Sequence, residues 1–138
     1  MDIQRLVTQL TTDEDKRHKP YRDTVGKLTI GVGRNLDDRG LSDDEIAYLL
    51  ANDIKIVEKE LDREMPWWRG MSDARQNAIA NIVFNIGMPR FKAFKKSIAA
   101  LQDKNYELAS IELMDSLWAR QVGDRAARVT KLIRTGQF

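Results

Sequence analysis

The chain has 138 residues, 42% of them hydrophobic and 32% charged, which suits one compact domain with a real core. It contains no cysteine and one histidine, which excludes disulfide bonds and thiolate metal sites and makes a histidine-rich metal centre unexpected. Any chemistry therefore has to come from carboxylates, hydroxyls, amides and arginines.

The net charge of +2 is unevenly distributed. Residues 1–85 carry 13 Lys and Arg against 16 Asp and Glu, and residues 86–138 carry 10 against 5. A basic C-terminal half suggests an acidic partner, such as nucleic acid or a bacterial wall polymer, although solvated helix faces explain it equally well.

The N-terminal MDIQRLVTQL lacks the features of a signal peptide, and no stretch approaches the ~20 apolar residues of a membrane span. We therefore expect synthesis in the cytoplasm, without stable insertion into a membrane.

An amphipathic helix is predicted at the N-terminus, because Ile3, Leu6, Val7 and Leu10 fall on one helical face. Glu14 takes the next position on that apolar stripe. Partial desolvation of its carboxyl would favour the protonated form, which a general acid requires. A carboxylate that ends a helix and reaches water is the alternative, and position alone favours it.

A short β-hairpin is predicted next. The period-two alternation of residues 27–33 indicates a strand, which residues 21–23 can pair with across a turn at Gly26. Thr29 and Gly31 share one face, where the missing side chain of Gly31 leaves space for a substrate or water to approach the Thr29 hydroxyl. A threonine in a strand is otherwise usually an ordinary strand residue.

Asp23 stands in polar surroundings where the chain enters this hairpin, which would keep its carboxyl ionised. Glycoside hydrolysis uses two carboxyl groups with opposite protonation preferences: one protonates the leaving oxygen, and the other activates water or attacks carbon. Glu14 and Asp23 are candidates for these two roles. An aspartate that only satisfies the backbone of a turn is, however, very common.

The rest of the chain is predicted to be helical. Ser42 and Glu45 form a capping box that opens a long helix, which ends near Glu64 because Pro66 follows. Its predicted inner face holds Ile46, Leu49, Leu50, Asp53, Ile54 and Val57. Further helices are predicted from the apolar stripes within residues 79–86, 91–101, 106–117 and 126–133, the last with Asp124 as its N-cap.

A second stripe on the residue 79–86 helix is formed by Asn77, Asn81, Phe84 and Asn85. Amides and an aromatic ring on one face suit a sugar chain, which offers hydroxyl and N-acetyl groups. Asn85 could instead be a simple helix terminus, and Phe84 a core residue.

Arg125 and Arg128 lie opposite the apolar face of the last helix. Arg125 is beside the start of that helix, where it could hold the Glu14 carboxylate or bind an anionic ligand. A solvated basic face is the alternative interpretation.

The order and spacing of these residues resemble the phage lysozymes. Glu14, Asp23 and Thr29 stand at the spacing E-x8-D-x5-T, which is similar to that family's catalytic signature, and YRDTVGKLTIGVGRN resembles its hairpin. The similarity continues through NAIANIVFNIGMPRFKAFKKSIAAL, SLWARQVGDRAARV and the terminal RTGQF. It therefore covers nearly the whole chain.

The resemblance implies an α+β, mostly α, lysozyme-like bilobed fold within a single domain, residues 1–138. A small lobe of about residues 14–60 would carry the hairpin, and a long helix would bridge it to a helical lobe. That helical lobe would contain residues 66–138 and the N-terminal helix of residues 2–13. The implied activity is hydrolysis of the β-1,4 bond between N-acetylmuramic acid and N-acetylglucosamine in peptidoglycan, with inversion at the anomeric carbon, causing host cell lysis.

By the same resemblance, Glu14 is the general acid, Asp23 positions or activates the attacking water, and Thr29 holds that water. Arg125 matches the family arginine that pairs with the catalytic glutamate. Substrate-binding positions are expected at Asn81, Phe84 and Asn85, with Gly31 added for the space it leaves.

Three features depart from the family pattern. Arg34 replaces the histidine that follows the hairpin glycine in the best-known member, so a permanently charged group would pair with any carboxylate there. The connection from Asn35 to Ser42 is very short, which predicts a trimmed small lobe and a more open cleft. The chain also ends at Phe138, soon after RTG.

No metal or cofactor is implied. The expected partner is the glycan strands of peptidoglycan, reached from the host cytoplasm through a membrane-permeabilising holin and cleaved in the periplasm by a monomer. Nucleic acid is not expected as a partner, since the arginines lack a recognition-helix pattern.

The alternatives to a hydrolytic muramidase are a lytic transglycosylase, which uses an acid but no activated water, and an inactive wall-binding domain. The presence of Asp23 and Thr29 argues against the first, and the intact trio with Glu14 argues against the second.

Overall fold

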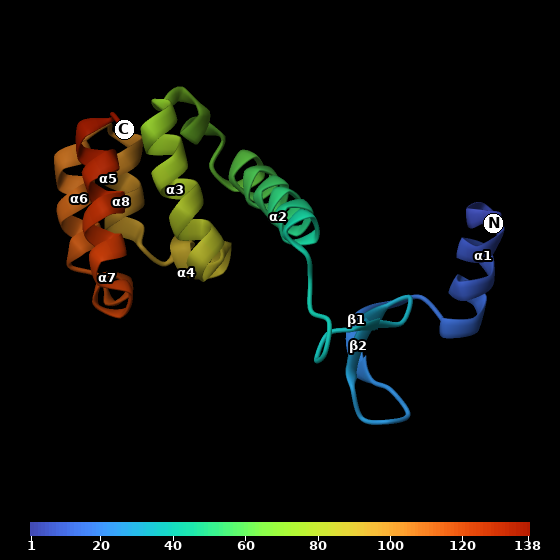
Figure 1. Cartoon of the computed structure of the whole chain (residues 1–138). Coiled ribbons are helices and arrows are strands. Elements are labelled where there is room, and N and C mark those ends of the chain that lie inside the picture. Colours follow the sequence, from blue (N-terminus) through green and yellow to red (C-terminus); the bar gives the residue numbers. More distant parts are fainter. The chain divides into compact units, whose positions relative to one another are not determined.

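A computed structural model describes residues 1–138 as a mostly helical chain with one small antiparallel sheet (Figure 1). The strands pair in the order β1-β2-β3. This architecture confirms the predicted α+β, mostly α, fold class. The elements are α1 (Ile3–Glu14), β1 (Arg17–Arg22), β2 (Leu28–Gly31), β3 (Arg34–Asn35), α2 (Asp43–Glu64), the 3-10 helix η1 (Pro66–Gly70), α3 (Asp73–Ile86), α4 (Met88–Lys92), α5 (Lys95–Gln102), α6 (Tyr106–Met114), α7 (Leu117–Val122) and α8 (Asp124–Thr135).

The chain divides into two compact units, Met1–Leu49 and Leu50–Phe138. The first contains α1 and the sheet, and the second contains η1 and helices α3 to α8. Helix α2 begins in the first unit and ends in the second. None of the helices is both long enough and apolar enough to cross a membrane.

In the first unit, α1 is the predicted amphipathic helix. The Asp2 carboxylate accepts a hydrogen bond from the Arg5 N–H, at 3.1 Å, and so caps its N-terminus. The helix ends at Glu14, because Asp15 has a φ of 63°, outside the helical region. The predicted hairpin is present, but β1 begins earlier than expected, at Arg17, with an irregularity before Tyr21.

Helix α2 has the predicted bounds. Its capping box is formed in both directions, since the Ser42 N–H donates to Glu45 Oε1 at 3.0 Å and the Glu45 N–H donates to Ser42 Oγ at 3.3 Å. The predicted inner face is only partly correct. Val57 is buried, together with Leu61, whereas the more N-terminal apolar residues of the face, namely Ile46, Leu49, Leu50 and Ile54, are exposed.

The second unit has one continuous apolar core. Helix α6 packs against α5 and α8, and α3 packs against α8, so that these four helices lie side by side (Figure 1). The fully buried large side chains of this unit come from η1 and from nearly every helix: Trp68, Phe91, Leu61, Ile79, Ile82, Leu101, Leu113 and Ile133.

Two predicted helices are each interrupted, which corrects the sequence interpretation. The stripe from Phe91 to Leu101 belongs to α4 and α5, with a break at residues 93–94. The stripe from Tyr106 to Leu117 is divided between α6 and α7. At that second break the Ser116 hydroxyl bonds the Leu113 carbonyl at 2.6 Å and accepts the Ala119 N–H at 3.2 Å, so it ends one helix and caps the next.

The predicted N-cap of the last helix is also wrong. Asp124 is the first helical residue of α8, and Gly123 takes the cap position with a φ of 59°. A positive φ is more readily adopted by glycine than by aspartate, which places the cap one residue earlier than expected.

Candidate active site

Glu14, the last residue of α1, lies against the turn that connects β2 and β3. Its Cδ and Oε2 are each 3.2 Å from the point that a Cβ on Gly33 would occupy. The side chain is exposed, so the first unit by itself does not provide the burial that the sequence analysis expects around this carboxyl. The contact joins the end of the first helix to the hairpin.

Asp23 and Thr29 are joined through the backbone of Lys27. The Asp23 carboxylate accepts the Val25 N–H at 3.0 Å and the Lys27 N–H at 2.8 Å, both at Oδ1. The Lys27 carbonyl in turn accepts the Asp23 N–H and the Thr29 hydroxyl, each at 2.9 Å. Asp23 is therefore a turn-forming aspartate, as the alternative interpretation held, but its Oδ2 has no protein partner and can bind water.

Thr29 is buried, with 3% of its surface exposed, so it is less open than the sequence analysis expects. It lies on the central strand of the sheet, with Tyr21 opposite it on β1 and Asn35 on β3. Gly31 does leave space, because nothing lies within 4 Å of its missing Cβ. Gly31, two residues along the same strand, therefore offers open space near Thr29.

Gly33 is the residue of this site that the sequence analysis missed. It has a φ of +71°, which favours glycine, and its lack of a side chain permits the approach of Glu14. The two glycines at the end of the strand, Gly31 and Gly33, were visible in the sequence. The contact of Gly33 with Glu14, 19 positions away, is revealed only by the fold.

In the glycoside hydrolysis expected from the sequence, replacing Gly33 by alanine should lower the rate by about 10- to 100-fold, because the methyl group would displace the Glu14 carboxyl. Both Gly33→Ala and the control Gly26→Ala force alanine into a positive φ, at a cost of about 1–2 kcal/mol each. Gly26 has a φ of +84° and no atom within 4 Å of its missing Cβ. Initial rates and thermal unfolding of both variants separate displacement of the Glu14 carboxyl from backbone strain. A similar rate loss in both would contradict the role of Gly33.

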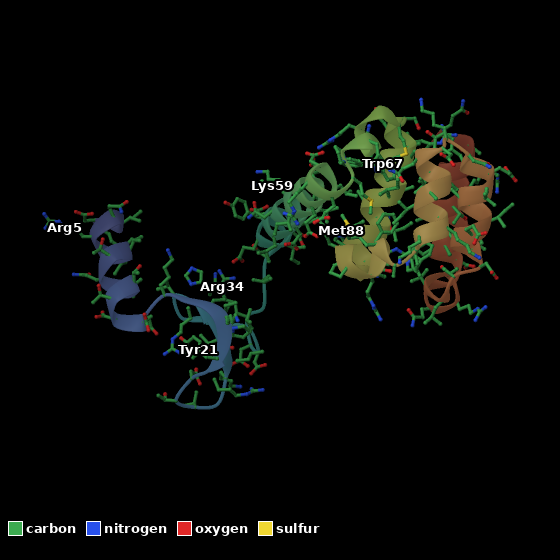
Figure 2. All side chains as sticks on the ribbon, turned by 180° about the vertical axis from the view of Figure 1, so that it is seen from behind. Arg5, Tyr21, Arg34, Lys59, Trp67 and Met88 are labelled. Atoms are coloured by element: carbon green, nitrogen blue, oxygen red, sulfur yellow. The ribbon has the colours of Figure 1, made fainter.

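Arg34, on β3, forms an ion pair with Glu45 at the start of α2, and its Nη1 donates to the Gly40 carbonyl at 3.2 Å. The side chain is labelled in Figure 2, in the sheet. Hydrogen bonds with Ser42 and the Arg34 guanidinium lower the pKa of Glu45 to about 2. Arg34, which departs from the family pattern, thus links the short 36–42 connection to α2 through Gly40 and Glu45.

The hydrogen bonds of Glu45 with Ser42, together with its ion pair with Arg34, predict a pH-dependent contribution to stability. Because the folded pKa of Glu45 lies below its ordinary value of 4.5, the carboxylate stabilises the protein above about pH 4.5 and loses this effect as the pH falls towards 2. Glu45→Gln should therefore lower the unfolding temperature at pH 7 and match the wild type near pH 2. Asp44→Asn, an exposed carboxylate of the same helical turn, is the control. A pH-independent difference for Glu45→Gln would contradict the assignment.

A separate hollow of about 440 Å³ lies on the second unit. Asn77, Asn81 and Phe84 line it from α3, and Arg125 lines it from α8. Apolar side chains complete its wall: Leu50, Ile54, Val57 and Ala80. A mostly apolar concave surface with a few amides and one cation suits a sugar, whose rings present both apolar faces and polar edges.

Arg125 is held in this hollow by Asn81. Its Nε donates to Asn81 Oδ1 at 2.9 Å, and its Nη2 donates to the Asn81 carbonyl at 3.4 Å. The pairing of Arg125 with Glu14 that the resemblance implies stays a prediction. Phe84 is 46% exposed, so it is not the core residue that the alternative interpretation allowed.

Asn85 differs from the other residues of the polar stripe, because it does not line this hollow. Its Oδ1 accepts a hydrogen bond from the indole N–H of buried Trp118 at 3.0 Å. This partner is 33 positions away, so the sequence stripe alone did not reveal it. The side chain therefore has a structural partner, whatever it also contributes to ligand binding.

No group of three or more His, Cys, Asp and Glu side chains is arranged to hold a metal ion. The first unit presents a carboxyl at Glu14 and, at Asp23, a carboxylate that accepts backbone N–H groups.

Comparison with known proteins gives two kinds of match. The family model described as phage lysozyme matches residues 12–134. The chain is also 26% identical over 163 residues to probable T4-type lysozyme 2 of Dictyostelium discoideum, covering 97% of this chain and 96% of that protein. Probable T4-type lysozyme 1 of the same organism is 24% identical over the same length, with the same coverage.

The pre-baseplate central spike protein Gp5 of Enterobacteria phage T4 is 26% identical over 161 residues, which cover 96% of this chain and 28% of that protein. These alignments are longer than the 138 residues of the chain, so the relatives carry segments that this chain lacks. The family match covers most of the chain, including the hairpin and the helices of the second unit. The chain therefore belongs to the phage lysozyme family.

Proposed function

We propose that this protein is a muramidase that hydrolyses the β-1,4 bond between N-acetylmuramic acid and N-acetylglucosamine in peptidoglycan. Membership of the phage lysozyme family and similarity to T4-type lysozymes support a lysozyme activity. The observation that carries the finer assignment is the placement of Glu14, Asp23 and Thr29 on one hairpin and the helix that precedes it.

In the proposed mechanism, Glu14 donates its proton to the glycosidic oxygen as the bond to the anomeric carbon breaks. Asp23 uses its free Oδ2 to orient the attacking water and to accept its proton. The Thr29 hydroxyl already donates to the Lys27 carbonyl, so it is left to accept a hydrogen bond from that water. Water adds from the face opposite the leaving group, which inverts the configuration.

The hollow on the second unit is proposed as a sugar-binding surface. Asn81 and Arg125 would bond hydroxyl or N-acetyl groups, and Phe84 would pack against a sugar ring. Gly31 would allow close approach of the substrate at the hairpin. Asn85 has the weakest case among these residues, because Trp118 already uses its carbonyl oxygen.

Purified peptidoglycan sacculi provide the test. The wild-type protein should clear a suspension of sacculi and release muropeptides with free reducing ends, identified by mass spectrometry. Anhydro-muropeptides would instead indicate a lytic transglycosylase, since that reaction uses no water. Binding to sacculi without any release of fragments would favour an inactive wall-binding domain and overturn the proposal.

In a cell, we propose that the protein reaches its substrate after a holin has permeabilised the inner membrane, and that it acts as a monomer on glycan strands in the periplasm. Host cells that express the protein alone should therefore remain intact, and added membrane permeabilisation should cause lysis. Lysis without permeabilisation would contradict this dependence.

A further inference from the structure

A basic edge, defined as residues 16–22, lies outside the residues assigned above. Its sequence KRHKPYR contains two lysines, two arginines and one histidine, and every residue except Tyr21 is exposed. Residues 17–22 form β1, an edge strand of the sheet. Cations in a row along an exposed edge attract anionic polymers.

Two of these cations already have partners within the first unit. Arg17 pairs with Asp15 at 3.5 Å and lies 4.6 Å from the centre of the Tyr21 ring, and Arg22 pairs with Asp37 at 3.6 Å. The side chains of Lys16 and Lys19 form no ion pair and no hydrogen bond within this unit. Their charges therefore remain available to a ligand.

In the sequence, the basic edge lies between the two proposed catalytic carboxylates. It begins two residues after Glu14 and ends one residue before Asp23. Arg17 is paired in register with Gly31, where the missing Cβ has no neighbour, and Glu14 lies against nearby Gly33. A polymer whose scissile bond is at Glu14 therefore has open strand surface beside it, with cations at its border.

We propose that the basic edge binds the peptide stems of the substrate, through ion pairs between stem carboxylates and the ammonium groups of Lys16 and Lys19. This inference rests on the proposed function. Each N-acetylmuramic acid carries its stem on the lactyl group, close to the bond that is cut, and the stems carry the free carboxylates of the polymer. Lysine suits such a ligand, because its flexible side chain places a point charge over a range of positions.

The test measures binding of the Glu14→Gln protein, which leaves sacculi intact, by co-sedimentation. Lys16→Gln/Lys19→Gln is compared with Lys55→Gln/Lys59→Gln, which removes the same charge from exposed positions of α2 (Lys59 is labelled in Figure 2). At low salt we expect about tenfold weaker binding for the first variant and no change for the second. On sacculi whose stems an amidase has removed, the two variants should bind equally. Lys16→Arg/Lys19→Arg should retain binding, and all variants should unfold at the same temperature.

Three outcomes would overturn the inference: equal binding losses in both variants, a loss that persists on stem-free glycan, or an equal dependence on these lysines with anionic phospholipid vesicles or DNA. Fragment release by the wild type is measured in parallel. If the wild type releases no muropeptides, the proposed function fails. If it releases them while the Lys16→Gln/Lys19→Gln protein binds stems normally, only the present inference fails.

Discussion

Glu14→Gln is expected to reduce the release of muropeptides from sacculi by about a thousandfold. Glutamine has nearly the same size and can occupy the same position against Gly33, but it has no proton to give to the glycosidic oxygen. General acid catalysis typically contributes about 10²–10⁴-fold to a rate. The measurement is the initial rate of release, with the concentration of reducing ends as the readout.

Asp13→Asn is the matched control, because it removes a neighbouring exposed carboxyl from the same helix. It should leave the rate within about a factor of two of the wild type, since surface substitutions away from special contacts have small effects. If both variants lost activity to the same extent, a general loss of negative charge near residue 14 would explain the data, and Glu14 would lose its role as the acid.

Leu61→Ala is expected to lower the free energy of unfolding by about 2–5 kcal/mol. Leu61 is completely buried in the core of the second unit and comes from the last turns of α2. Truncation leaves a cavity that the surrounding close-packed core fills only in part. Denaturant unfolding monitored by circular dichroism gives the change directly.

Ile56→Ala serves as the comparison, because Ile56 lies on the same helix and is 55% exposed. Its replacement should cost less than about 1 kcal/mol. Equal losses at the two positions would mean that burial of Leu61 in the core of the second unit adds little to stability.

The elements that the sequence predicted well are those with local signals at both ends. Helix α2 begins at a capping box and ends just before a proline, and both signals lie within a few residues of the boundary. The two interrupted helices show the opposite case. Apolar periodicity continues across residues 93–94, although the helix is interrupted there. The rings of Phe91 and Phe94 pack edge to face across this break, with their centroids 6.3 Å apart. A break of this kind depends on packing between elements, which periodicity does not encode.

The same distinction applies to the site. The spacing of Glu14, Asp23 and Thr29 made them candidates, since each is separated from the next by fewer than ten residues. The contact of Gly33 with Glu14 and the hydrogen bond from Trp118 to Asn85 join residues far apart in the chain, and they required the fold. The burial of Thr29 also depended on pairing with strands on both sides.

The hydrogen bond between Trp118 and Asn85 has an optical consequence. Indole fluorescence responds to the polarity and hydrogen bonding of its surroundings, and here a buried indole N–H has an exposed amide as its partner. A saccharide that draws this amide away would shift the emission of Trp118. With Trp67 and Trp68 replaced by phenylalanine, Trp118 would be the only tryptophan, and its emission would report a change at Asn85 without any attached dye.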